Sequence, residues 1–141
     1  MRTLARRAVV CGLAAAAALS PLAAAEAATP EPRLYAPTAL VLTVAQGEDA
    51  ATASPMRAVT LTCTPTPGGT HPSAQRACSE LRAVQGRFDA LSGDNQRSCV
   101  KIYDPVVVTA QGIWEGRRVD FERTFSNSCV MQSENANVYS F

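Results

Sequence analysis

Arg57-Ala58-Val59-Thr60-Leu61-Thr62-Cys63 alternates along its length and puts Val59, Leu61 and Cys63 on one side. A repeat of two residues is typical of a strand that buries one face. The segment 64–69 that follows is rich in proline and glycine, which predicts a turn region. Residues 57–63 therefore predict one strand of a half-buried sheet.

Beyond this turn region the apolar spacing becomes that of a helix. Pro72 is tolerated in a first helical turn, and Gly86 is a plausible stop at the other end. The apolar residues between them recur at helical spacing: Ala74, Ala77, Cys78, Leu81 and Val84. One amphipathic helix is therefore expected after the strand.

Further strands are predicted elsewhere in the chain. In residues 40–44, Leu40, Leu42 and Val44 share one face, and Val41 lies on the other with Ala39. The remaining strands are expected at 106–109, 119–125 and 138–141, with turns at Gln111-Gly112 and Glu115-Gly116 and a short second helix near Cys129. The pattern predicts an α+β fold with an antiparallel sheet of about five strands, one main helix and a short second helix.

The N-terminus reads as a signal peptide. Its three arginines precede a short apolar run, residues 8–19, and Ala25-Glu26-Ala27 fits an A-x-A cleavage site. We expect cleavage after Ala27 or Ala28, which leaves residues 29–141 as one secreted, extracellular domain. A retained membrane anchor is the alternative, but a run of about twelve residues is too short to span a bilayer.

The charge of the mature chain excludes several partners. Removal of residues 1–28 takes away three arginines and one glutamate, which leaves 10 basic and 11 acidic residues and a net charge of −1. A basic stripe of the kind that binds nucleic acid is therefore not expected, and neither is a role at a membrane surface.

Four cysteines remain after the signal peptide: Cys63, Cys78, Cys99 and Cys129. An even number in an exported chain predicts two disulfides, and four cysteines allow three connectivities. Pairing each cysteine with its nearest neighbour would close two separate loops. The ordinary role of such bridges is stability, at about 2–4 kcal/mol each.

No catalytic or metal-binding group stands out in the sequence. The only histidine, His71, has no partner that suggests a nucleophile and base, so we expect it to be structural. Asp120 and Glu122 share the predicted solvent face of a strand. Because a C-x-x-C motif and a second histidine are both missing, we expect neither a metal nor a cofactor, and an enzyme is disfavoured.

The segment Cys99-Val100-Lys101-Ile102-Tyr103-Asp104-Pro105 carries the strongest functional signal. If Cys99 is bridged, Lys101 lies on an extended loop that is pinned beside it, and β-branched neighbours favour extended backbone. A trypsin-like protease reads such a loop as a substrate. The alternative is an ordinary exposed lysine beside a strand. The polar, turn-rich residues 92–96 before it are expected to be mobile, and the role of residues 92–98 is open.

Several segments resemble one known family. These are Leu34-Tyr35-Ala36-Pro37, residues 39–44, residues 57–65, Gly69-Thr70-His71-Pro72, Ala77-Cys78, Leu81, Tyr103-Asp104-Pro105-Val106 and Phe125-Ser126-Asn127. Together they span essentially the whole mature chain, and they resemble the Streptomyces subtilisin inhibitor family. The resemblance implies a secreted, dimeric inhibitor of serine proteases. It also implies the pairings Cys63–Cys78 and Cys99–Cys129, and a reactive peptide bond between Lys101 and Ile102.

On this hypothesis the loop from Cys99 to Asp104 contacts subtilisin-like and trypsin-like proteases. One departure from the family is Val100, where proline is frequent, and a valine there could soften the loop. The apolar residues on both faces of the first strand predict a homodimer interface around Val41. A secreted, disulfide-stabilised binding module without protease inhibition is the alternative function.

Overall fold

The computed structural model describes residues 36–93, 98–135 and 137–141. The expected signal peptide and residues 94–97 of the loop before Cys99 lie outside this part of the chain. The elements in chain order are β1 (Thr38–Gln46), β2 (Ser54–Thr64), β3 (Gly68–Gly69), α1 (Ala74–Ala83), the 3₁₀ turn η1 (Phe88–Ala90), β4 (Val106–Trp114), β5 (Arg117–Phe125) and α2 (Ser128–Asn135).

The five strands form one antiparallel sheet in the order β3-β2-β1-β4-β5. The central strand β1 pairs Leu42 with Val59 on β2 and with Ala110 on β4. All three side chains are buried, so this register collects the apolar positions of neighbouring strands on the same face. The α+β class with five antiparallel strands, a main helix and a short second helix is confirmed.

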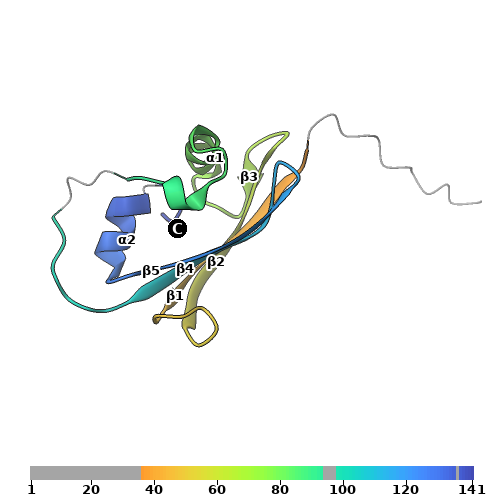
Figure 1. Ribbon diagram of the computed structural model, residues 1–141. Coiled ribbons are helices and arrows are strands. Elements are labelled where there is room, and N and C mark those ends of the chain that lie inside the picture. The colour runs from red at the N-terminus through yellow and green to blue at the C-terminus, as the bar shows by residue number, and fades with distance from the viewer. Residues whose placement is uncertain (1–35, 94–97, 136) are drawn as a thin grey trace, which may run out of the picture. The chain divides into compact units, whose positions relative to one another are not determined.

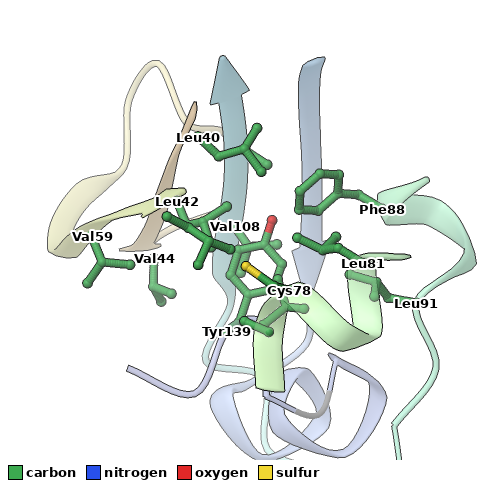
Figure 2. Close-up of a cluster of buried hydrophobic side chains, with 14 of the residues drawn as sticks. Leu40, Leu42, Val44, Val59, Cys78, Leu81, Phe88, Leu91, Val108 and Tyr139 are labelled. Atoms are coloured by element: carbon green, nitrogen blue, oxygen red, sulfur yellow. The ribbon is translucent and has the colours of Figure 1, made fainter. Parts of the chain in front are cut away.

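Both helices cover the same face of the sheet (Figure 1). The buried face of α1 is formed by Ala77, Cys78 and Leu81, as the helical spacing predicted. Figure 2 shows Tyr139 from the C-terminal segment beside Cys78 and Leu81 of α1 and the side chains of the sheet. Phe88 of η1 adds a ring that stacks on Phe121 of β5, with 5.4 Å between centroids. The core therefore lies between one sheet face and the helical layer.

The C-terminal segment corrects one prediction, because residues 138–141 do not form a strand. Val138 and Tyr139 are fully buried in the core, and the Ser140 N–H closes a turn on the Asn137 carbonyl at 3.2 Å. The carbonyl of Val138 bonds instead to Nε2 of His71 at 3.1 Å. Four alternating residues cannot distinguish a strand from a segment that fills a core.

Two glycine-containing segments were predicted as turns and lie in strands instead. Gly68–Gly69 is β3, the missing fifth strand, and Gln111-Gly112 lies inside β4. A Cβ on Gly69 would lie 2.3 Å from the Thr60 carbonyl oxygen, and one on Gly112 would lie 2.2 Å from that of Ala39. These glycines therefore allow close approach of neighbouring backbones within the sheet.

The other face of the sheet carries Val41, which is 47% exposed. Its partners in register are Thr60 on β2 and Gln111 on β4, and both are exposed. Next along the strand, the hydroxyls of Thr43 and Thr109 form a hydrogen bond. Val41 is thus flanked on both neighbouring strands by uncharged polar side chains, and Asp120 and Glu122 follow on β5.

Candidate functional site

The segment from Cys99 to Pro105 runs to β4 without regular secondary structure, as the open arc in Figure 1 shows. Lys101 is exposed, and so are Val100 (65%), Ile102 (63%) and Tyr103 (68%). The described residues include only two other large apolar side chains that are exposed, Val41 and Met56. Apolar side chains gathered at the surface mark a binding site for another molecule.

A disulfide fixes the N-terminal end of this segment. Cys99 is bonded to Cys129, 30 residues later on α2, and Cys63 on β2 is bonded to Cys78 on α1. The structure therefore has the two pairings that the family resemblance implied. The helix that carries Cys129 is also tied to β5 by an ion pair between Arg123 and Glu134.

The side chain of Asn127 holds the backbone on both sides of Lys101. Its Nδ2 donates to the carbonyl of Val100 at 3.1 Å and to the carbonyl of Ile102 at 2.8 Å. Its Oδ1 accepts from the N–H of Val130 at 3.0 Å, which makes Asn127 the N-terminal cap of α2. Asn127 is only 7% exposed, so these bonds lie largely outside water.

Asn127 was not among the predicted site residues. Besides its place in the family-like segment Phe125-Ser126-Asn127, its one sequence signal is its position between a strand that ends in Phe125 and a predicted helix, where a cap residue is common. That signal gives the cap but not the contact with the loop, since 25 residues separate Asn127 from Ile102.

The segment after Ile102 is held by main-chain and side-chain contacts with the sheet. The Asp104 N–H donates to the Ser126 carbonyl at 2.9 Å, and Oδ1 of Asp104 accepts from Nε2 of Gln46 at 2.6 Å. The Tyr103 hydroxyl donates to the carboxylate of Glu48. This hydrogen bond, with smaller contributions from desolvation and the nearby negative charge, raises the pKa of Tyr103.

A groove of about 370 Å³ separates the loop from the start of α2. It is lined by residues 99–103 of the loop on one side and by Ser126 and Val130 on the other. Hydrogen bonds to Asn127 and Ser126 therefore hold the backbone of the loop, while the side chains of residues 100–103 are exposed.

His71, Asp120 and Glu122 have the burial that the sequence predicted for them. His71 is buried, accepts from the Ser73 N–H through Nδ1 at 3.0 Å and packs edge-on against Phe141. Asp120 and Glu122 are exposed. Within the described ranges, His, Cys, Asp and Glu side chains form no group of three that could hold a metal ion. Among the same residues, no helix is long and apolar enough to cross a membrane.

A surface loop that is fixed by a disulfide and by the buried amide of Asn127, with exposed apolar side chains around Lys101, is typical of a protein that binds a partner through this loop. Comparison with known proteins agrees with this class. Residues 36–127 match the model of the subtilisin inhibitor-like family. The chain belongs to this family.

Individual relatives cover the chain well. Subtilisin inhibitor-like protein 5 of Streptomyces fradiae is 68% identical over 107 residues, which are 76% of this chain and all of that protein. Trypsin inhibitor STI2 of Streptomyces longisporus is 51% identical over 144 aligned positions that cover both chains completely. Among solved structures, sermetstatin of Streptomyces caespitosus in complex with Bacillus licheniformis subtilisin matches with a TM-score of 0.68 and 45% identity, over 74% of this chain and 99% of that one.

Proposed function

We propose that this protein inhibits serine proteases of the subtilisin-like and trypsin-like classes, with Lys101–Ile102 as its reactive bond. The proposal rests on the environment of Lys101 in the structure. This exposed side chain lies between two carbonyls that share one buried donor, Asn127, and it follows a disulfide-bonded cysteine by two residues. Relatives named as subtilisin and trypsin inhibitors support both target classes.

The loop enters the protease cleft as a short extended segment and pairs with its backbone, as a substrate does. Residues Cys99 to Asp104 make the contact, and Lys101 fills the primary specificity pocket. An acidic group in a trypsin-like pocket pairs with the ammonium, while a subtilisin-like pocket accepts the aliphatic stem. Lys101 is the only lysine of the sequence, so no other lysine can take this role.

Inhibition rather than digestion follows from preorganisation. Because Asn127 and the Cys99–Cys129 bridge already hold the loop in place, binding costs little conformational entropy. If the protease cuts the bond, the two ends stay close together, and religation competes with release. Such interfaces bury about 1,600 Å² in total and are among the tightest known. A nanomolar complex, about −12 kcal/mol, is expected with a well-matched protease.

Export is part of the same proposal. The signal peptide at residues 1–28 would deliver residues 29–141 to the extracellular space, where both disulfides are stable. Cleavage after Ala27 or Ala28 would be identified by sequencing the N-terminus of the secreted protein.

The protein is further proposed to be a homodimer through the open sheet face around Val41. This side chain is 47% exposed, and its neighbours in register, Thr60 and Gln111, are uncharged. The carboxylates of Asp120 and Glu122 lie one strand further away, on β5. A two-fold pair places the same face on both partners. The reactive loop is not part of this face, so one dimer would bind two proteases.

The test is a titration of trypsin and of subtilisin with the purified protein. A stoichiometric loss of both activities is expected, and mass spectrometry should locate slow cleavage between Lys101 and Ile102. Acylation of amines should abolish trypsin inhibition in the wild type but not in Lys101→Arg, which keeps the cation and has no reactive ε-amine. If the folded protein leaves both proteases active, a binding module without inhibition is the better assignment.

A further inference from the structure

Glu48 lies in the turn between β1 (Thr38–Gln46) and β2 (Ser54–Thr64). It contacts the reactive loop, residues Cys99 to Asp104, at Tyr103. Its carboxylate accepts a hydrogen bond from the hydroxyl of Tyr103. The residue before it, Gly47, donates its N–H to the carbonyl of Pro105 at 2.9 Å. The turn is thus bonded to the loop on both sides of Asp104.

The turn that carries Glu48 is itself held by β5. The carbonyl of Glu48 accepts from Oγ1 of Thr124 at 2.6 Å. Two residues later, the N–H of Ala50 donates to Oε1 of Glu122 at 3.0 Å. Glu48 therefore holds Tyr103 from a turn that is anchored to the sheet at two points, not from a free loop tip.

Tyr103 combines exposure with a fixed hydroxyl. Its side chain is 68% exposed, and its hydroxyl has a charged acceptor. Hydrogen bonds to an ionised acceptor are stronger than those between neutral groups. The same hydrogen bond to Glu48 raises the pKa of Tyr103, with smaller contributions from desolvation and from the negative charge of the carboxylate.

We propose that Glu48 is a positioning residue for the reactive bond, which acts by holding Tyr103 and thereby the neighbouring Ile102. This inference rests on the proposed function. Hydrolysis adds one water across the Lys101–Ile102 bond, breaks the C–N bond and leaves a carboxylate on Lys101 and an ammonium on Ile102. In religation the protease serine first forms an ester with the Lys101 carboxyl group, and water leaves. The deprotonated amine of Ile102 then attacks the ester carbonyl carbon. The C–N bond forms, the C–O bond to serine breaks, and the serine oxygen leaves with a proton as the free hydroxyl.

The two ends of the cut bond are held by different means. The Lys101 end is held covalently, through the Cys99–Cys129 bridge. The Ile102 end is held by hydrogen bonds, and Tyr103 is the next residue along the chain. Fixing Tyr103 limits the volume that the Ile102 amine can explore, which raises its effective concentration at the Lys101 carbonyl.

The test measures the equilibrium between intact and cut inhibitor in the presence of a catalytic amount of trypsin. One reaction starts from the intact form and a second from the cut form, and both should reach the same ratio. The cut form stays one molecule through its disulfide and is heavier by one water. Glu48→Ala, Tyr103→Phe and the double variant should each raise the cut-to-intact ratio by about threefold, because all three lose the same hydrogen bond. Glu48→Gln keeps an acceptor oxygen and should lie between wild type and Glu48→Ala.

Glu115→Ala is the matched control, since Glu115 is an exposed glutamate in the turn at the far end of β4. It should leave the ratio unchanged. A tyrosine ¹³Cζ titration provides a second measurement, in which Glu48→Ala should lower the pKa of Tyr103. An unchanged ratio in Glu48→Ala, or additive effects in the double variant, would overturn the role of Glu48 alone. A wild type that is not cut at Lys101–Ile102 would overturn the proposed function and this inference together.

Discussion

Asn127 offers the sharpest test of how the loop is held, because its two side-chain atoms have separate tasks. Nδ2 donates to the carbonyls of Val100 and Ile102, while Oδ1 caps α2 at the Val130 N–H. Asn127→Ala removes both tasks. Asn127→Asp keeps an oxygen for the cap but replaces the donor with a second oxygen, which faces two carbonyl oxygens.

The magnitudes follow from the bonds that are lost. A cap residue contributes about 1 kcal/mol, and aspartate caps about as well as asparagine. Each hydrogen bond to the loop contributes about 1 kcal/mol. Asn127→Ala should therefore destabilise the protein by about 3 kcal/mol, and Asn127→Asp by about 2 kcal/mol with α2 intact. A loss of 2 kcal/mol in the loop corresponds to roughly thirtyfold weaker inhibition.

The assay follows trypsin activity over hours at equimolar inhibitor, with the cut form counted by mass spectrometry and unfolding followed by the fluorescence of the single tryptophan, Trp114. In both variants, protease activity should return as the Lys101–Ile102 bond is cut. If folded Asn127→Asp inhibits as durably as the wild type, the side-chain bonds to the loop do not hold the reactive bond, and the preorganisation argument fails at this residue.

Three further predictions concern the remaining parts of the proposal. Lys101→Met should weaken trypsin inhibition by about 2–5 kcal/mol by leaving the acidic pocket unpaired, and equal losses against trypsin and subtilisin in inhibition assays would contradict the pocket assignment. Joint replacement of Cys99 and Cys129 by serine should lower the free energy of unfolding by about 2–4 kcal/mol. The folded variant should become a substrate that is cut after Lys101, which mass spectrometry would reveal. Durable inhibition by this variant would contradict the role of the disulfide in holding the loop. Val41→Asp should shift the sedimenting species from dimer to monomer with Lys101 still accessible, whereas a wild type that sediments as a monomer at micromolar concentration would refute the dimer.

Local spacing predicted most of the fold. The alternation at residues 57–63 buries the expected side chains. The helical stripe predicted from Ala74 to Val84 buries its central members, while Val84 follows the end of α1 and is partly buried. Such patterns succeed because each repeat reports on one face of one element. They failed at residues 138–141 and at Gly112, where the outcome depends on what a neighbouring segment leaves free. A glycine that signals a turn and a glycine that lets two strands approach look alike in sequence.

The candidate site divides in the same way. The sequence by itself singled out Lys101, the four cysteines and the extended residues around them, because residue type and short spacing carry that information. Only the tertiary structure brought Asn127 and Glu48 to the loop, across 25 and 55 residues. Those contacts depend on the register of β1, β4 and β5 and on the position of α2. Register is set by the burial of whole strand faces, so no local pattern at Asn127 or Glu48 determines which carbonyl or hydroxyl each will meet.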